Sequence, residues 1–357
     1  MALTRQDALR LLRFCLGPDD SGSVEVADDG AALVTISPAE PSIGVRTFEA
    51  GDFEAALRQA ADAGLLKAAC VEKQISFLDT GSARGAAAAE SLAAARAARP
   101  DLFPRLIGAT AALLHETQVE RGLSAIFAAS GRRTFRRELT RQRERTDGRS
   151  ERLLSLWREL EPVLGGALAR RVEQAEGKLK ALVGSRAPID CGELSPVAIV
   201  DGYSAANAEL LAVGDGALVA FSSAAQRAGA VACIVMLYAK EKTGIERARI
   251  GAALASHSIS NEDRRLLASV VAARSSYLHV FSATAPRPAE QLLERALASA
   301  TSADLARSED LLLTGRETEL DLDARGWFTL VSRNMDLLGE IGGVALGLVG
   351  EDGPTRT

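Results

Sequence analysis

Residues 106–130 read LIGATAALLHETQVERGLSAIFAAS, and this stretch decides the fold class. Its apolar positions recur every three or four residues, which predicts one long α-helix. One face of that helix would carry Ile107, Ala111, Leu114, Gln118, Arg121, Ala125 and Ala128. An arginine therefore lies among small and apolar side chains, where a core residue is expected.

A similar short sequence occurs again further along the chain. Residues 118–122 read QVERG and residues 244–248 read GIERA. The second stretch also belongs to a helical stripe, made of Cys233, Leu237, Lys240, Gly244, Arg247, Gly251 and Leu254. The repetition indicates two related helical bundles, each of which donates one buried arginine.

The remainder of residues 105–342 is predicted to be helical as well. Periodic apolar residues and breaks delimit further helices at 134–164, 167–183, 196–213, 217–255, 261–281, 288–300 and 323–341. Ser195-Pro196 and Ser260-Asn261 are good helix starts, and Gly214-Asp215-Gly216 is predicted to break a helix. Eight or nine helices exceed one simple bundle, so the expected fold is mainly α, with two four-helix bundles.

A different module is expected before the bundles. Residues 1–80 predict a small α+β domain with a hairpin, in which strands at 24–26 and 32–36 flank Asp28-Asp29-Gly30. A helix over 52–66 and a strand over 70–78 would follow. We expect an Ala-rich linker, helical or loose, at 81–104 and a tail at 343–357.

Composition excludes several classes of protein. The chain has 357 residues, of which 47% are hydrophobic, and a net charge of −5, which argues against a chain-wide nucleic-acid footprint. The longest apolar run, 228–239, is too short to span a membrane, and the first residues lack a signal-peptide core. Four isolated cysteines indicate reduced thiols, so we expect a cytoplasmic protein without a membrane partner.

Motifs of common enzymes are missing from the sequence. It contains no Walker loop, dinucleotide fingerprint, HExxH or GxSxG, and its three histidines make a multi-histidine metal centre improbable. We therefore expect no catalytic residues, no metal and no cofactor.

Two interpretations of Arg121 and Arg247 remain open on pattern alone. A buried guanidinium needs a counter-charge. In the first interpretation each arginine forms a structural ion pair, with partners among Glu116, Glu120, Glu241 and Glu246. In the second, both arginines face a small anion, whose planar oxygens suit the guanidinium fork. A separate arginine-rich run, 132–149, is read as a solvated helix face, with a protein or RNA contact as the alternative.

These residues resemble a known family. Residues 116–124 (ETQVERGLS), the basic helix with Arg141-Gln142-Arg143, and residues 239–248 (AKEKTGIERA) resemble the nitrate- and nitrite-sensing (NIT) domain of bacterial signalling proteins. The Tyr203 helix and the segment 327–338 match more weakly. The resemblance implies an all-helical sensor over 105–342 that binds nitrate or nitrite between two bundles, with the anion-binding arginines at Arg121 and Arg247.

A sensor also needs a part that transmits its signal. In one known arrangement an RNA-binding ANTAR-type module follows the sensor, but only about 15 residues follow Gly342 here. We therefore expect output through the N-terminal region or a separate protein partner, including a homodimer. Residues 55–81 weakly resemble the last helix and wing of a winged-helix domain, yet residues 1–90 are acidic, with 14 acids and 8 bases. A degenerate winged helix for protein contact, a DNA-binding module and an unrelated α+β domain all stay open.

Three functions compete at this point. The first is a nitrate or nitrite sensor without catalysis that regulates transcription or signalling. The second is a DNA-binding transcriptional regulator that senses another small ligand. The third is a scaffold whose arginines are only structural. The surroundings of Arg121 and Arg247 distinguish the first function from the third.

Overall fold

The computed structural model describes residues 21–26, 32–37, 46–50, 59, 102–160, 166–218, 221 and 223–347. The chain divides into two compact units, residues 1–91 and 92–357.

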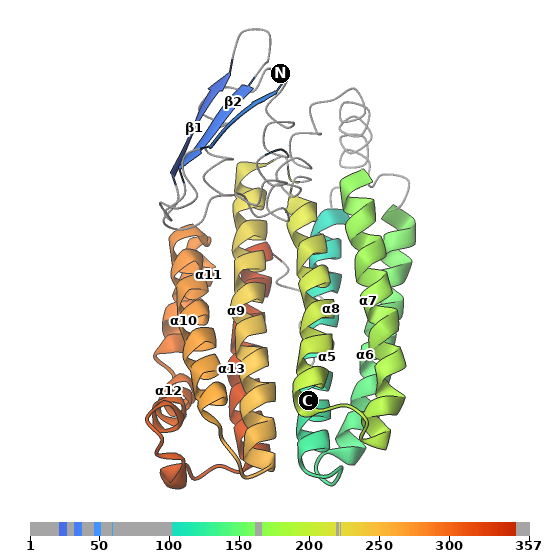
Figure 1. Ribbon diagram of the computed structural model, residues 1–357, viewed down its shortest axis with the longest axis vertical. Coiled ribbons are helices and arrows are strands. Elements are labelled where there is room, and N and C mark those ends of the chain that lie inside the picture. Colours follow the sequence, from blue (N-terminus) through green and yellow to red (C-terminus); the bar gives the residue numbers. More distant parts are fainter. Residues whose placement is uncertain are drawn as a thin grey trace. The chain divides into compact units, whose positions relative to one another are not determined.

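The first unit contains a three-stranded antiparallel sheet in the order β1-β2-β3 (Figure 1). Its strands are β1 (Ser21–Val26), β2 (Ala32–Ser37) and β3 (Arg46–Ala50). Val24 pairs with Val34, so the predicted hairpin is confirmed, while β3 was not expected from the sequence. The predicted helix over 52–66, strand over 70–78 and winged-helix features lie outside the described residues, apart from helical Gln59.

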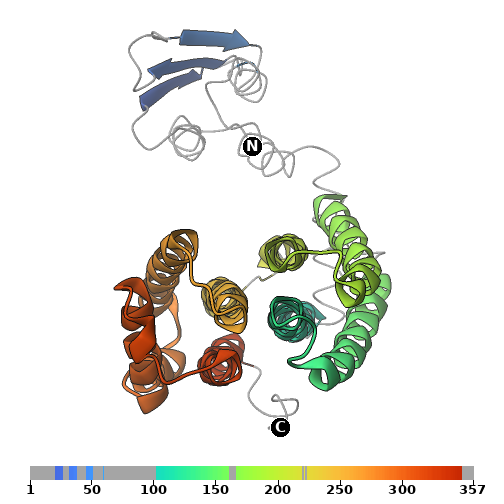
Figure 2. The same ribbon diagram turned by 60° about the horizontal axis from the view of Figure 1, so that its bottom comes forward.

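The second unit consists of two helical bundles that lie side by side (Figures 1 and 2). Helices in the first bundle are α5 (Leu102–Ala129), α6 (Arg136–Leu160), α7 (Gly166–Cys191) and α8 (Pro196–Ala217). Those in the second are α9 (Ala224–Ala255), α10 (Asn261–Thr284), α11 (Arg287–Leu297), α12 (Ala300–Leu313) and α13 (Ala324–Leu346). The expectation of a mainly helical protein is confirmed.

Two short helices share the fourth position of the second bundle. α11 packs with α9 and α13 in one apolar cluster through Ala289 and Leu293, and α12 joins a second cluster through Leu305 and Leu312. The sequence predicted one helix at 288–300 and missed α12. The division lies at Ser299, whose side chain accepts a hydrogen bond from the Ser302 backbone and so starts a new helix.

Helix starts agree with the sequence, whereas one predicted break is wrong. The Ser195 and Ser260 side chains cap α8 and α10 as expected. Residues 214–216, however, stay inside α8. A Cβ at Gly214 would lie 2.6 Å from the Ile234 side chain, so this glycine serves close packing between α8 and α9 instead of ending a helix.

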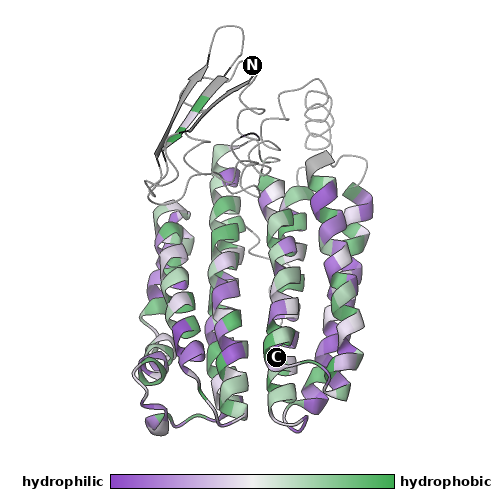
Figure 3. Ribbon diagram, in the orientation of Figure 1, coloured by the Kyte–Doolittle hydropathy of each residue, from purple (hydrophilic) through white to green (hydrophobic). Residues whose placement is uncertain are grey.

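α9 connects the two bundles. It packs against α10 and α13 of its own bundle and against α5 and α8 of the other bundle, so four helices surround it (Figure 2). Figure 3 shows hydrophobic residues interspersed with hydrophilic ones along the helices of both bundles, and the buried apolar residues form core clusters. Where α5, α8 and α9 meet, the buried residues are small: Ala125, Val200, Ala248 and Ala252. Small side chains let the helix backbones approach closely there.

Among the described residues, α10 is the one helix whose length and composition would allow it to cross a membrane. It packs along α9, and Leu267, Val270 and Phe281 enter the core clusters of the second bundle. Its Arg274 forms ion pairs with Glu246 and Glu309. In this structure α10 is therefore one wall of a bundle.

Candidate functional site

Arg121 of α5 and Arg247 of α9 lie at the interface between the bundles, and both are fully buried. Each one reaches a glycine of the opposite helix. A Cβ at Gly244 would lie 2.5 Å from Nη2 of Arg121, and a Cβ at Gly122 would lie 3.3 Å from Nε of Arg247. The two glycines thus provide the space in which the guanidinium groups cross the interface.

Arg121 has a carboxylate partner from the other bundle. Its Nη1 and Nη2 donate to the two oxygens of Glu241, the second at 3.3 Å, and Nη1 also donates to Ser204 Oγ at 2.8 Å. Glu241 accepts two further bonds, from Gln118 at 2.8 Å and Asn207 at 3.0 Å. This carboxylate is therefore well held, and the charge of Arg121 is neutralised across the bundle interface.

Arg247 has no such partner. Its Nη1 donates to Ser332 Oγ at 2.8 Å, and its guanidinium lies over the Phe328 ring, 4.6 Å from the centroid. Nε and Nη2 have no hydrogen-bond acceptor, and no carboxylate oxygen of the described residues lies within 4.0 Å. Burial, followed by the like charge of Arg121, lowers the pKa of Arg247 to about 9.

A buried lysine adds to this positive charge. Lys240, two helical turns before Arg247 on the same face of α9, is 4% exposed. Its Nζ lies 3.1 Å from Nδ1 of His115 on α5. Burial lowers the pKa of Lys240 to about 8. The charge of Lys240, together with burial, holds the pKa of His115 well below its usual range, so the imidazole is neutral and accepts from the ammonium.

The acidic neighbours of the two arginines point elsewhere. Glu120 accepts from Arg186 and, at 2.8 Å, from the Tyr203 hydroxyl within the first bundle. Glu246 accepts from Arg274 at 2.7 Å within the second. The interface thus has three buried cations, Arg121, Arg247 and Lys240, and among the described residues Glu241 is the buried acid that faces them.

The structure brings Arg121 and Arg247 together, as the sequence predicted, but it gives them different surroundings. Arg121 forms the ion pair of the first interpretation, and Glu241 was among the predicted partners. Arg247 has the unmatched charge of the second interpretation. His115 and Ser332 were not predicted, because their roles depend on the register between helices far apart in sequence. Lys240 lies on the predicted stripe of Arg247 and could have been recognised as a second charge on that face.

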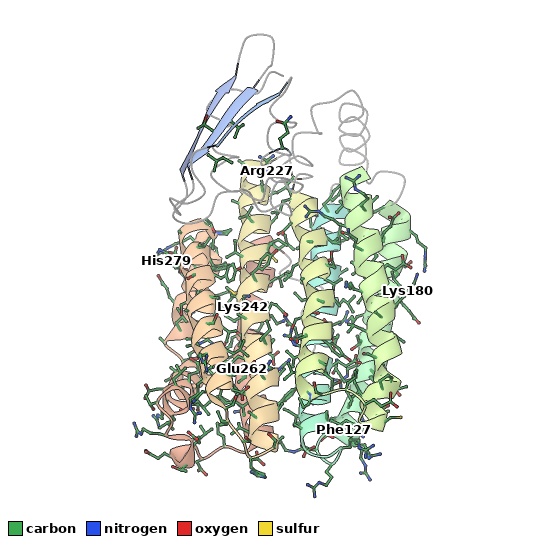
Figure 4. All side chains as sticks on the ribbon, viewed as in Figure 1. Phe127, Lys180, Arg227, Lys242, Glu262 and His279 are labelled. Atoms are coloured by element: carbon green, nitrogen blue, oxygen red, sulfur yellow. The ribbon has the colours of Figure 1, made fainter. Side chains whose placement is uncertain are left out.

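The arginine-rich run lies on α6 and the turn before it. Arg133, Arg137, Arg141 and Arg145 are exposed, whereas Arg143 pairs with Asp190 at 2.7 Å. This agrees with a solvated helix face, and a partner contact through these arginines stays a prediction. On the outer flanks of the bundles, Lys180 and His279 project away from the interface (Figure 4).

Comparison with known proteins identifies the class as a sensory signalling domain. A family model described as nitrate and nitrite sensing matches residues 112–347. The chain belongs to this nitrate- and nitrite-sensing (NIT) family. Its fold is similar to that of the NasR transcription antiterminator, with a TM-score of 0.66, 22% sequence identity, and coverage of 73% of this chain and 71% of that one. No curated protein sequence matches significantly.

Proposed function

We propose that this protein binds nitrate or nitrite between its two bundles, at the centre formed by Arg121 and Arg247, and passes the change in bundle packing to a regulatory output. The family supports the ligand class. The observation that carries the proposal is the free edge of Arg247, where Nε and Nη2 have no acceptor although the side chain is fully buried.

That edge has the geometry for a small planar oxyanion. Nε–H and Nη2–H of a guanidinium point in the same direction, so together they can bind two oxygens of one anion. Nitrate and nitrite each present two oxygens in a plane with a single negative charge. The Phe328 ring covers one face of the guanidinium, so an anion would approach the Nε–Nη2 edge in the plane of the group.

The regulatory output is proposed to act in the cytoplasm, through a protein partner or a second copy of the chain. Free thiols at Cys191 and Cys233 fit a reducing compartment. Binding shifts the bundles toward the state that holds the anion best, and the size of the shift depends on the difference in affinity between the two states. Contact with nucleic acid through the N-terminal region would be an alternative route.

Isothermal titration calorimetry on the full chain tests this proposal. Nitrate and nitrite are titrated into the protein, and chloride and sulfate are titrated at matched ionic strength. We expect saturable binding of nitrate, nitrite or both, and at least tenfold weaker binding of the two control ions. Equal heats for all four anions, or none, would contradict the proposal.

A further inference from the structure

The site contains a repeat that relates Arg121 to Arg247. Thr117, Glu120 and Arg121 on α5 have the same spacing as Thr243, Glu246 and Arg247 on α9. Each arginine donates from Nη1 to a serine hydroxyl at 2.8 Å, Ser204 on α8 and Ser332 on α13. In each bundle, therefore, the last helix provides the serine that accepts a hydrogen bond from that bundle's arginine.

The repeat is broken at the counter-charge. Glu241, the partner of Arg121, lies six residues before Arg247 on α9. The residue six positions before Arg121 on α5 is His115. The α5 position equivalent to Glu241 therefore carries an imidazole, which accepts from Lys240 and bears no negative charge. One arginine has a carboxylate from the opposite bundle, and the other has a neutral ring.

Lys240 makes the two sides still more different. Its equivalent on α5 is Leu114, so the Arg247 side has a second buried cation and the Arg121 side has none. Asp336 of α13 is close enough for its charge to act on both Lys240 and Arg247. It is exposed to solvent, however, and in the described part of the chain no ion pair within 4.0 Å joins it to either cation. The positive charge is concentrated on one side of the interface.

We propose that a single anion binds on the Arg247 side only, at the position equivalent to the Glu241 carboxylate, where Arg247 and Lys240 hold it together. This inference rests on the proposed function and specifies its site. In the repeat, the Glu241 carboxylate of α9 pairs with Arg121 of α5. The bound anion would supply the corresponding negative charge for Arg247 and Lys240 of α9, next to His115 of α5. His115 selects for an external anion because it leaves this position without a built-in carboxylate.

The decisive variant restores the repeat. In His115→Glu a carboxylate is placed where the bound anion is proposed, beside Arg247 and Lys240. We expect nitrate affinity to fall at least a hundredfold and the nitrate-free melting temperature to rise above that of His115→Gln. His115→Gln keeps a neutral acceptor, and we expect it to bind nitrate at least tenfold more tightly than His115→Glu. Both measurements use the full chain, by calorimetry and thermal denaturation.

A second variant tests Lys240 independently of how His115→Glu folds. Lys240→Met removes the charge and keeps the length of the side chain, and we expect at least tenfold weaker nitrate binding. Lys242→Met is the matched control, because Lys242 lies two residues away on a different face of α9 (Figure 4). It should bind nitrate like the wild type.

The outcomes separate this inference from the proposed function. If the wild type binds no nitrate or nitrite, the proposed function fails. If the wild type binds and His115→Glu or Lys240→Met binds equally well, the function stands and the one-sided site is wrong. Loss of binding in His115→Gln as complete as in His115→Glu would also overturn the inference, since the charge at this position would then be irrelevant.

Discussion

Arg121 and Arg247 have the same burial and different partners, so they should respond differently to truncation. Removing one partner of a buried ion pair leaves an uncompensated charge, which is strongly destabilising. Removing a buried cation without a counter-ion relieves its desolvation instead. The two arginines therefore allow a structural role to be distinguished from a ligand-binding role within one protein.

Arg121→Ala is expected to destabilise the nitrate-free protein by about 3–5 kcal/mol, because it leaves the Glu241 carboxylate buried without its cation. Chemical denaturation measures this change. The double variant Arg121→Ala/Glu241→Gln should recover a substantial part of the loss, since the amide carries no charge. An Arg121→Ala protein as stable as the wild type would show that this ion pair contributes nothing.

Because Lys240 is buried, we expect the unfolding free energy of the nitrate-free protein to rise at alkaline pH. Burial lowers its pKa to about 8 in the folded state, whereas the unfolded chain keeps the proton to about 10.5. Between these values the unfolded state binds more protons, so stability increases with pH, by at most about 1.4 kcal/mol per pH unit for one group. Arg247, whose pKa is about 9, acts in the same direction.

Denaturation between pH 7.5 and 9.5 checks this prediction, with Lys240→Met as the comparison. The charged and titratable groups that act on Lys240 are Glu116 on α5, Cys233 and Arg247 on α9, and Asp336 on α13, and His115 on α5 contacts it directly. Burial raises the pKa of the Cys233 thiol to about 12, so this thiol stays neutral throughout the range. A rise with the same slope in Lys240→Met would assign the effect to another group.

At the scale of elements, the approach of α5, α9 and α13 depends on Gly122. A Cβ there would lie 2.8 Å from the Phe328 ring of α13 and 3.3 Å from Nε of Arg247. Gly122→Ala is expected to destabilise the protein by about 1–3 kcal/mol and to weaken nitrate binding, because the ring and the guanidinium must move.

Gly148 on α6 is the matched control for this substitution. A Cβ at Gly148 meets nothing within 4 Å. Gly148→Ala should leave nitrate binding unchanged and stabilise the helix by about 0.5–1 kcal/mol. Thermal denaturation measures the stability of both variants, and calorimetry measures their nitrate affinity. Similar nitrate affinities in Gly122→Ala and Gly148→Ala would mean that close packing at Gly122 is not needed for binding.

Arg274 joins three helices of the second bundle. From α10 it donates at 2.7 Å to Glu246 of α9 and to Glu309 of α12. Burial and the nearby Glu309 carboxylate raise the pKa of Glu246 well above its ordinary value. The guanidinium is thus the charge that lets two buried acids lie side by side.

Arg274→Met is expected to destabilise the protein by about 3–5 kcal/mol at pH 7, because two acids then face each other without a cation. The loss should be smaller at pH 5. There the raised pKa lets Glu246 take up a proton in the folded state, and stability is lost as the pH rises. Urea denaturation at both pH values measures this. An equal loss at pH 5 and pH 7 would contradict repulsion between the acids as the cause.

Most helices could be predicted from the sequence, because capping and periodicity are local. Ser195 and Ser260 begin helices as their chemistry requires. Gly214 and Gly216 read as a break, since the sequence does not show that Ile234 and Leu168 pack against them. α12 was missed because its boundary depends on one serine cap inside a run of small residues, 298–303, that would also fit a continuous helix.

At the scale of the whole helical unit, the site was half predictable. Periodicity predicted that both arginines lie on buried helix faces, and the similar sequences ERG and ERA indicated that the two positions are equivalent. The partner of Arg121 comes from the other bundle, and periodicity within one helix does not define the register between two. For the same reason the contact of Lys240 with His115 could not be derived from either helix alone.

The two bundles meet through a charged interface that is incomplete on one side. Glu241 of α9 forms an ion pair with Arg121 of α5. Arg247 contacts Ser332 and Phe328 of α13, within its own bundle, and has no counter-ion. In our proposal, an anion held by Arg247 and Lys240 of α9 beside His115 of α5 would supply a second link between the bundles. Ligand binding should therefore stabilise the helical unit as a whole, because it favours the state in which both links are made.

The most direct measurement of this account is the nitrate-dependent melting temperature of the wild type and of Arg247→Met, each with chloride at matched ionic strength as the control. For the wild type, nitrate at a hundred times its dissociation constant should add about 2.7 kcal/mol to the unfolding free energy and raise the melting temperature by a few degrees. Arg247→Met should be as stable as the wild type without nitrate and show no nitrate shift. A preserved nitrate shift in Arg247→Met, together with a large loss of nitrate-free stability, would contradict the account.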